Sequence, residues 1–447
     1  MKKYETYKDS GLEWLGSVPV HWSSIKMKYL FSFGRGLNIT KSDLVENGTP
    51  VISYGQIHSK INTGVAINDE LLRYVPNEMA LEHPENKVCT GDFIFADTSE
   101  DKEGCGNCVY IDREGIYAGY HSLVLDGKGR DNKYFAYLFK SEPWRIQIRS
   151  KASGVKVFSI TQSIMGESTV ILPTLPEQRT IAAYLDYKVG QIDALISEKE
   201  KMVDDLKAYR SSVITEAVTK GLDKNVEMKE SGLEWLGMVP GNWEVLPLKH
   251  LVSEPLQYGA NESADDCIIS DPRYIRITDI TENGDLRDST YKTLPRSKAI
   301  SYMLKKGDIL FARSGATVGK TYVFKEDYDA CFAGYLIKAS CNKKLIPMFL
   351  YYFTSSNSYE NWKNSIFNQA TIQNIGADKY SILPIPLPSR SEQQKIVDYL
   401  NDKIGKIENA ISEQEHQLSD LKAYKSSLIT EAVTGKIDLR DWQTQKA

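Results

Sequence analysis

The stretch SGATVGKT, from Ser314 to Thr321, has the residue types of a phosphate-binding loop. A P-loop needs four residues between its glycines and a helix after its Lys-Ser/Thr pair. Here three residues separate Gly315 from Gly319, and Tyr322-Val323-Phe324 continues as a strand. The spacing therefore argues against nucleotide binding and favours a glycine-permitted turn between two strands.

Two further motifs suggest chemistry but depart from the required pattern. Cys105-Gly106-Asn107-Cys108 has the spacing of a zinc or redox pair, but no second Cys pair follows and no thioredoxin-like βαβ pattern surrounds it. Asp271-Pro272-Arg273-Tyr274 resembles the Asp-Pro-Pro-Tyr loop of amino-methyltransferases without its second proline. We interpret the first as buried or incidental thiols and the second as the entry to a strand over 274–280.

The ionisable residues form no catalytic constellation in the sequence. Asp97, Glu100 and Asp101 cluster on a predicted loop, where a solvated acidic turn is favoured over general acid–base work. No Ser/His/Asp or Cys/His set can be assembled from the six histidines, which are His21, His58, His83, His121, His250 and His416. A large chain with an internal duplication and no catalytic set favours a reader or a scaffold.

Basic, amide and aromatic residues on predicted loops are suited to reading nucleic acid. Arg and Lys hold phosphates and read guanine, and Asn and Gln read adenine. The DNA-binding candidates are Arg35, Lys41, Tyr54, Gln56, Lys60, Lys151 and Lys156 in the first half, and Tyr258, Arg273, Arg276, Arg313, Ser314, Thr317, Lys320, Asn368, Gln369 and Gln373 in the second. Since most such residues in any soluble protein are plain surface, each is a hypothesis.

Two long helices must position these loops. Segments 177–220 and 392–435 align without a gap at an offset of 215 residues, with apolar residues at alternating steps of three and four. That period predicts helices with one narrow apolar seam, as in a coiled coil. The seam residues are Leu185, Ile192, Ile196, Val203 and Leu206 in the first helix, and Leu400, Ile407, Ile411, Leu418 and Leu421 in the second. A seam this narrow needs a partner, and we expect each helix to pair with the other.

Caps and polar interruptions complete the prediction for the helices. Thr174-x-x-Glu177 and Ser389-x-x-Glu392 have capping-box spacing, and glycines follow at the expected C-terminal caps, Gly221 and Gly435. Each helix would run about 60 Å at 1.5 Å per residue. Polar residues interrupt the seam at Lys199, Arg210, Gln414 and Lys425. We favour a register-setting role for them over a seam that opens to meet a partner protein.

The regions outside the helices are duplicated as well. KDSGLEWLGSVPVHW at 8–22 recurs as KESGLEWLGMVPGNW at 229–243, and GDFIFA at 91–96 matches GDILFA at 307–312. Ala118-Gly119-Tyr120 similarly matches Ala333-Gly334-Tyr335, and an aromatic helical run at 134–139 matches one at 349–353. Two copies of one unit favour a pseudo-two-fold axis, which makes the paired helices antiparallel and places the globular regions at opposite ends.

We therefore predict an α+β chain in which two tandem α/β globular regions are separated by two long helices packed as an antiparallel coiled coil. The predicted boundaries are 1–173 and 222–388 for the globular regions, 174–221 and 389–436 for the helices, and 437–447 for a C-terminal tail.

Composition sets broad limits. Hydrophobic content of 41% and charged content of 26% are typical of a soluble globular protein. No apolar run approaches the roughly 18 residues of a membrane span, the N-terminus lacks the apolar core of a signal peptide, and the cysteines do not form a disulfide framework, which suits the cytoplasm. The net charge of −4 argues against a chain that is basic throughout, without excluding a local basic face.

Several of these motifs together resemble the DNA-specificity (S) subunit of type I restriction–modification enzymes. They are the paired SGLEWLG openings, the GDILFARSGATVGK and PRYIRITDI stretches, and the EQ-x-x-I helices ending in ITEAVT, and the resemblance covers essentially the whole chain. It implies two target-recognition domains joined by two conserved antiparallel helices, with no catalytic activity or cofactor in this chain. Each domain is then expected to read one half of a split double-stranded DNA target, while the helices set the gap.

The resemblance also implies partners. Two modification subunits, which bind S-adenosylmethionine and methylate adenine N6, are expected to dock around the helices, and restriction subunits with ATP- and Mg-dependent translocation and nuclease activity to join them. The first region has DTSEDKEGCGNC where the second has RSGATVGK, so the two half-sites are expected to differ. Two other functions stay open: a stand-alone nucleotide-dependent or methyltransferase enzyme, and a coiled-coil scaffold without a nucleic-acid role.

Overall fold

The computed structural model describes residues 2–128, 132–264, 270–281, 284–367 and 374–443. The chain is α+β and forms two compact units, one made of the residues up to Lys199 and from His416 onward, the other of Glu200–Glu415. Each unit therefore holds one globular region together with part of each long helix. The boundary between the units falls inside the helices.

The long helices are α6 (Leu175–Lys220) and α11 (Arg390–Val433). At the start of α6, Thr174 and Glu177 form a reciprocal capping box, with Thr174 N donating to Glu177 Oε2 at 3.1 Å. At the helix ends, Gly221 and Gly435 have φ of 76° and 71°, a conformation that glycine adopts without steric cost. At the start of α11, Glu392 N donates to Ser389 Oγ at 3.2 Å, which is one of the two bonds of the predicted capping box there. The other predicted caps are confirmed.

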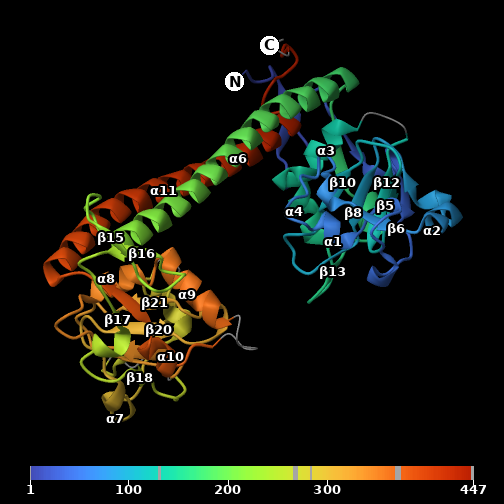
Figure 1. Cartoon of the computed structure of the whole chain (residues 1–447). Coiled ribbons are helices and arrows are strands. Elements are labelled where there is room, and N and C mark those ends of the chain that lie inside the picture. The colour runs from blue at the N-terminus through green and yellow to red at the C-terminus, as the bar shows by residue number, and fades with distance from the viewer. Residues whose placement is uncertain (1, 129–131, 265–269, 282–283, 368–373, 444–447) are drawn as a thin grey trace. The chain divides into compact units, whose positions relative to one another are not determined.

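Within each unit the segments of α6 and α11 lie side by side and run antiparallel (Figure 1). In the first unit, Asp193 Oδ1 lies 2.6 Å from Lys425 Nζ, and Lys199 Nζ donates to Gln417 Oε1 at 2.5 Å. Residue numbers thus rise along α6 as they fall along α11. The second unit repeats this order with the ion pairs Lys207–Glu415 and Arg210–Glu408. The predicted antiparallel pairing is confirmed in both units.

The predicted seam residues lie between the paired helices. Those of the first unit are Leu185, Ile192 and Leu418, which are buried, and Ile196 and Leu421, which are half-buried. Those of the second unit are Val203, Leu400, Ile407 and Ile411, which are buried, and Leu206, which is half-buried.

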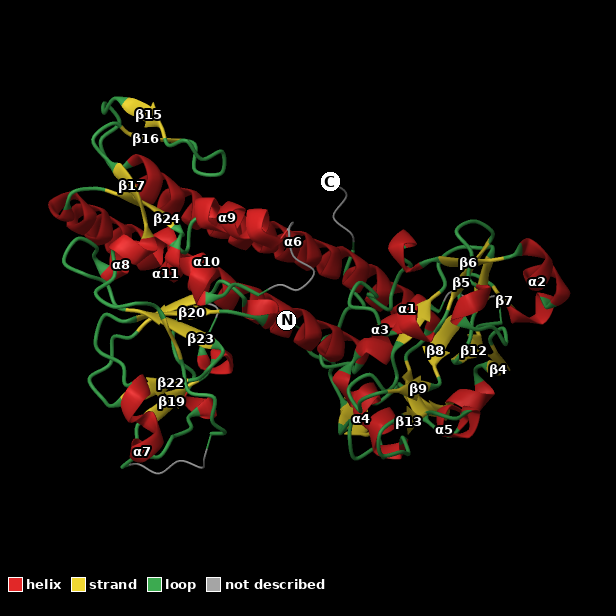
Figure 2. Ribbon diagram, turned by 60° about the horizontal axis from the view of Figure 1, so that its bottom comes forward, coloured by secondary structure: helices red, strands yellow, loops and turns green. Residues whose placement is uncertain are grey.

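The first globular region is built on two four-stranded sheets. One is antiparallel, in the order β10 (Cys108–Tyr110), β8 (Phe93–Ala96), β12 (Ser122–Asp126) and β4 (Ser32–Arg35); β8, β12 and β4 are labelled beside one another in Figure 2. The other has the order β6 (Arg73–Val75), β5 (Thr49–Ile52), β11 (Ile116–Ala118) and β7 (Lys87–Val88), with β5 and β11 parallel. The region's helices are α1 (Tyr54–Ile57), α2 (Asn77–Glu82), α3 (Lys133–Lys140), α4 (Glu142–Lys151) and α5 (Gln162–Gly166).

Strand β8 is apolar along its whole length because both of its faces are buried. Phe93 and Phe95 pack against Phe139 of α3, with ring centroids 5.0 and 5.2 Å apart from it. Ile94 and Ala96 point to the other face, into the core shared with the second sheet. Successive side chains of a strand alternate between faces, so one strand serves both cores.

The second globular region has an equivalent plan. Its four-stranded sheet has the order β18 (Gln257–Tyr258), β23 (Leu336–Ala339), β20 (Ile309–Ala312) and β21 (Thr321–Val323), and β19 (Arg273–Ile275) pairs in parallel with β22 (Ala330–Phe332). Its helices are α7 (Arg296–Ala299), α8 (Pro347–Phe353), α9 (Asn357–Phe367) and α10 (Ala377–Ser381). The two predicted aromatic helices are thus present, as α3 and α8.

Short antiparallel pairs frame both regions. They are β1 (Tyr7–Asp9) with β2 (Ser17–Pro19), β3 (Ser23–Lys26) with β14 (Thr169–Leu172), β9 (Thr98–Ser99) with β13 (Phe158–Ser159), β15 (Met228–Glu230) with β16 (Met238–Pro240), and β17 (Glu244–Pro247) with β24 (Pro384–Leu387). The strand predicted over 274–280 is wrong beyond Ile275. A 3-10 turn follows there, because the Asp279 carboxylate accepts the Arg276 backbone N–H at 2.8 Å.

Each globular region docks on its helix pair through equivalent tyrosines. Tyr137 of α3 donates to Asp186 of α6 at 2.6 Å, and Tyr352 of α8 donates to Asn401 of α11 at 2.7 Å. Both partners of the second contact lie 215 residues after those of the first. The duplication seen in the sequence is therefore also a duplication of packing within the two units.

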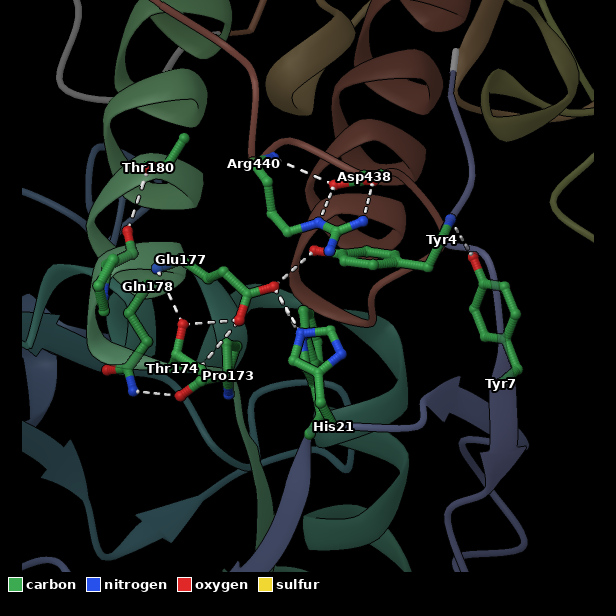
Figure 3. Close-up of polar contacts among 12 residues, drawn as sticks. Tyr4, Tyr7, His21, Pro173, Thr174, Glu177, Gln178, Thr180, Asp438 and Arg440 are labelled. Atoms are coloured by element: carbon green, nitrogen blue, oxygen red, sulfur yellow. Dashed lines mark hydrogen bonds and ion pairs between the residues drawn. The ribbon is translucent and has the colours of Figure 1, made fainter.

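The start of α6 carries a buried carboxylate on which several segments converge (Figure 3). Glu177 Oε1 lies 2.8 Å from His21 Nε2 and accepts hydrogen bonds from Tyr4 and Trp22, each at 3.3 Å. Burial disfavours the charged form, but hydrogen bonds from His21, Thr174 and Trp22 outweigh it, and the pKa of Glu177 is lowered. The carboxylate thus ties the N-terminal segment to the helix.

The C-terminal segment packs at the same place. Asp438 N donates to Lys2 O at 2.9 Å, and the Arg440 guanidinium lies 5.1 Å from the centre of the Tyr4 ring. Trp442 then packs edge-on against Tyr184 of α6, with ring centroids 5.4 Å apart. Both ends of the described chain are therefore fixed on the first unit.

Candidate nucleic-acid interface

In the first region, one sheet edge gathers polar side chains at the end of β8. Ser122 pairs with Ala96, the last residue of β8, and the next residue, Asp97, donates its backbone N–H to His121 O at 3.2 Å. Ile160 N donates to Asp97 O at 2.8 Å. Both backbone groups of Asp97 are therefore used by residues next to neighbouring strands, and its side chain is half-exposed at the edge.

The second region repeats this arrangement at the end of β20. Leu336 pairs with Ala312, and Arg313 N donates to Tyr335 O at 3.1 Å. Ile375 N donates to Arg313 O at 2.9 Å. The same backbone hydrogen bonds place Arg313 where the first region has Asp97, and Tyr335 where it has His121.

This register corrects one alignment made from the sequence. Matching Ala118-Gly119-Tyr120 to Ala333-Gly334-Tyr335 pairs Tyr120 with Tyr335, whereas the strand pairing pairs His121 with Tyr335. The structure shifts this landmark by one residue, since strand register is set by backbone pairing that short identical motifs do not reveal.

A third position completes the edge. Arg35, the last residue of β4, pairs with Leu123, the second residue of β12. Tyr258, the last residue of β18, pairs with Ile337, the second residue of the equivalent strand β23. We call these six residues the recognition edges: Arg35, Asp97 and His121 in the first region, and Tyr258, Arg313 and Tyr335 in the second. All six side chains are exposed or half-exposed.

Arg313 is held in place by an aromatic ring. Its guanidinium lies 4.9 Å from the centre of the Tyr258 ring, and Tyr258 Oη accepts the Ala377 backbone N–H at 2.9 Å. A guanidinium over an aromatic face is stabilised by the ring's negative face. Among the described residues, no hydrogen-bond partner meets the buried Nε of Arg313.

The loop after Arg313 is the turn predicted between two strands. β20 and β21 are antiparallel, and a 3-10 turn, Gly315–Thr317, connects them. Gly319 is required there, since its φ is 86° and an added Cβ would meet Lys363 Cδ at 2.2 Å. The polar candidates on the loop, Ser314, Thr317 and Lys320, are half-exposed.

Comparison with known proteins gives this edge its context. The family model for the type I restriction modification DNA specificity domain matches the chain twice, at residues 19–203 and 241–416. The chain belongs to this family. Each match covers most of one globular region and the first part of the long helix that follows it, and both matches end within a few residues of the boundary between the two units.

Curated relatives agree along most of the chain. The EcoBI specificity subunit of Escherichia coli is 25% identical over 67% of this chain and 64% of its own length. The EcoKI specificity subunit of Escherichia coli strain K12 is 21% identical over 96% of this chain and 92% of its own length. A solved chain from a study of assembly and conformational transition of a type I restriction–modification system superposes with a TM-score of 0.70, at 16% identity over 94% of this chain and 99% of its own.

As a specificity subunit, the chain is a DNA sequence-recognition component of a type I restriction–modification complex and is not a catalytic one. The comparisons thus confirm the resemblance seen in the sequence. Across the described part of the chain, no helix is both long and apolar enough to span a membrane.

Two of the predicted DNA contacts of this specificity subunit already have partners within the chain. Arg273 is only 4% exposed, its guanidinium donates to Tyr328 Oη at 2.9 Å and Arg287 O at 2.8 Å, and Tyr291 stacks on it. Its role is therefore in the core. Arg276 is half-buried, and its guanidinium donates to the Asp279 carboxylate and to a backbone carbonyl. A basic residue after a turn looks the same in sequence whether it faces the core or the solvent.

The other candidates of the first region divide into two groups. Tyr54 and Gln56 lie on α1, where the Tyr54 ring contacts His58 with centroids 4.6 Å apart and Gln56 Oε1 accepts the Ser53 N–H at 3.1 Å. Tyr54 also lines a cavity of 340 Å³ with Glu100 and other polar residues. The lysines are exposed on separate segments, Lys41 in a 3-10 turn, Lys60 after α1, Lys151 at the end of α4 and Lys156 in the loop before β13.

Three candidates and one motif need separate mention. Asn368, Gln369 and Gln373 lie outside the described residues. The Cys105 and Cys108 thiols are buried, Cys105 Sγ donates to Asp101 O at 3.6 Å, and burial raises the pKa of Cys108 to about 12. No group of three or more His, Cys, Asp and Glu side chains suited to a metal ion occurs within the described ranges.

Proposed function

We propose that each globular region of this subunit reads one half of a split, asymmetric double-stranded DNA target. The observation that carries the proposal is the pair of recognition edges, which have the same backbone frame and different side chains. One edge combines a carboxylate, an imidazole and a guanidinium, and the other combines a guanidinium with two phenols. A shared frame with unlike side chains recognises unlike base sequences in one binding mode.

The helix pair is proposed to set the gap between the half-sites and to dock two modification subunits. Large apolar side chains lie exposed on it, among them Tyr209 and Tyr424, which are 47% and 50% exposed and occupy equivalent positions. Aromatic residues are enriched at protein interfaces. In this proposal the modification subunits bind S-adenosylmethionine and methylate adenine N6, the restriction subunits use ATP and Mg, and the whole complex works in the cytoplasm.

Methylating an adenine requires flipping it out of the duplex into a cofactor-bearing pocket. The division of labour in this proposal leaves that step to the modification subunits and base reading to this chain. The two readers share one tether, so binding of one half-site raises the effective concentration of the other reader at its own half-site.

A domain exchange tests the proposal. Residues 26–170 are replaced by the corresponding region of another specificity subunit, and the methylated motif is determined by methylome sequencing of cells that express the complete system. We expect one half of the motif to change and the other to stay the same. If both halves change, or neither, the assignment of one region to one half is wrong.

Measurements on the purified chain and on the assembled complex distinguish the two alternative functions from the proposed one. Tight binding of ATP or S-adenosylmethionine by the chain alone, or methylation without modification subunits, would support a stand-alone enzyme. Equal affinity of the assembled complex for all DNA sequences at every salt concentration would support a scaffold. The proposed function predicts that DNA is methylated by the complex and not by the isolated chain, and only at one motif.

A further inference from the structure

We propose that Asp97 and Arg313 are equivalent base-reading residues of opposite charge. Each recognises one G·C pair of its own half-site, Arg313 through the guanine and Asp97 through the cytosine. The inference rests on the proposed function and goes further by naming one reading position in each region and the base that it selects. The sequence alone does not place Asp97 among the DNA-binding candidates, because its pattern is that of a solvated acidic turn.

The equivalence of the two positions is a matter of backbone geometry. Each residue follows the last residue of a central strand, donates its N–H to the residue before the neighbouring strand, and accepts an N–H from a segment near the end of its region. The two donor distances, 3.2 and 3.1 Å, and the two acceptor distances, 2.8 and 2.9 Å, nearly coincide. The two side chains start from equivalent backbone positions, so we expect each to contact the equivalent position of its own half-site.

The side chains at these positions share an unusual property. Among the described residues, neither Asp97 Oδ1 nor Arg313 Nε, both buried, has a hydrogen-bond partner, although His121 Nδ1 lies 3.5 Å from Asp97 Oδ1. Most buried polar atoms in proteins have a partner, so an unmatched atom asks for an explanation. Two unlike sequences thus leave an unmatched polar atom at equivalent positions of the part that the structure describes, as side chains that read a bound base would.

For Arg313 the complementary group is guanine. Guanine offers O6 and N7 acceptors in the major groove, which a guanidinium binds with two hydrogen bonds. The Tyr258 ring supports the guanidinium from one side, with its centre 4.9 Å away. This support restricts the conformations of the free side chain and reduces the entropy lost on binding.

For Asp97 the complementary group is a base amino group. A carboxylate is repelled by phosphates, so its presence on a DNA-reading edge is favourable only where a donor reaches it. Cytosine N4 is the donor that carboxylates accept from in the major groove. His121 Nδ1 lies 3.5 Å from Asp97 Oδ1, and His121 holds a φ of 50°, which is uncommon for a residue with a side chain. This strained backbone fixes the imidazole beside the carboxylate.

The test uses the complex of this chain with its modification subunits. Duplexes that the complex binds are selected from a pool of random sequence, and affinity is then measured for the selected duplex and for every single-base variant. The variants are Asp97→Asn and Arg313→Gln. We expect each to lower the discrimination at one G·C pair by about tenfold to a hundredfold, in one half-site only. Because an amide reads adenine N6 and N7, Asp97→Asn is further expected to shift the preference at its position from cytosine towards adenine.

Matched controls lie at the opposite ends of the same sheets. Asp126→Asn removes an exposed carboxylate at the far end of β12, and Lys306→Gln removes an exposed cation just before β20. Neither is expected to change base preference. The unaltered half-site serves as an internal control for folding in each variant, since a misfolded chain would lose both.

The outcomes separate the two levels of inference. If the wild-type complex prefers no sequence, the proposed function fails. If it prefers a sequence but Asp97→Asn and Arg313→Gln leave all preferences unchanged, or weaken binding equally for every variant duplex, the assignment of these two residues is wrong. A selected half-site without a required G·C pair would likewise overturn it.

Discussion

Asp193 of α6 and Lys425 of α11 form an ion pair of 2.6 Å across the helix seam, and Glu408 and Arg210 repeat it with the helices exchanged. The acidic partners are 215 residues apart, and so are the basic ones. Each unit therefore holds the same ion pair between its helix segments, with α6 and α11 exchanged. Three of the polar residues that interrupt the seam, Lys199, Arg210 and Lys425, are paired across it, which agrees with the register-setting role expected from the sequence and not with an open seam.

Reversing one charge of the Asp193–Lys425 pair tests how much the pair stabilises the protein. Lys425→Glu places two carboxylates side by side, and we expect the free energy of unfolding to fall by about 1 kcal/mol, a value already discounted for partial solvent exposure. Adding Asp193→Lys restores the pair and most of the stability. Urea unfolding followed by circular dichroism measures both. The control is Lys406→Glu, which breaks an exposed pair within α11 and should change stability by less than about 0.5 kcal/mol.

The carboxylate at the start of α6 gives a second prediction. Glu177→Gln replaces a buried, charged acceptor of bonds from His21 and Trp22 with a neutral amide, and we expect a loss of about 1–3 kcal/mol in unfolding free energy. Glu392→Gln is the matched control, since Glu392 holds the equivalent place, accepts from Trp243 at 3.1 Å and is only half-buried. A smaller loss at Glu177 than at Glu392 would contradict the prediction.

The same residue predicts a dependence on pH. The folded-state pKa of Glu177 lies below its unfolded value of about 4.3, so its contribution to stability is complete above that pH and is lost as pH falls through the folded pKa. Stability of the wild type should therefore fall more steeply with acid than that of Glu177→Gln. Acid unfolding of both proteins measures this difference. If the stability of the two proteins falls equally steeply as pH is lowered, Glu177 does not make this contribution.

Two glycines inside the helices predict a gain in stability. Gly190 of α6 and Gly405 of α11 occupy equivalent positions, and a Cβ added at either would meet no heavy atom within 4 Å. Alanine there is expected to stabilise by about 0.5–1 kcal/mol, because glycine loses more backbone entropy in a helix. Gly435→Ala should do the opposite, since φ is 71° and the new methyl group would meet Pro19 at 2.4 Å. Thermal unfolding of the three variants checks the signs.

The helices could be predicted from the sequence because their information is local and repeated. Seam residues such as Leu185 and Leu400 recur at the helical period, and the 215-residue offset shows both copies at once. The recognition edges could not, because strand pairing brings together residues far apart in the chain. Asp97 meets His121 only through the register of β8 and β12, and the burial of Arg273 depends on tyrosines that approach from other segments.

The covalent links between the two units give the last prediction. They join within the helices, between Lys199 and Glu200 and between Glu415 and His416. Inserting one heptad at both points preserves the seam and lengthens each helix by about 10 Å at 1.5 Å per residue. That length corresponds to about three base pairs at 3.4 Å each, so we expect the original target to be lost and the selected gap to grow. Both half-sites should stay unchanged, because neither recognition edge is altered.

A heptad inserted in α6 alone puts the paired charges out of register and should destabilise the protein. Selection of bound duplexes by the complete complex measures gap and half-sites together, and an unchanged gap would show that the helices do not set it.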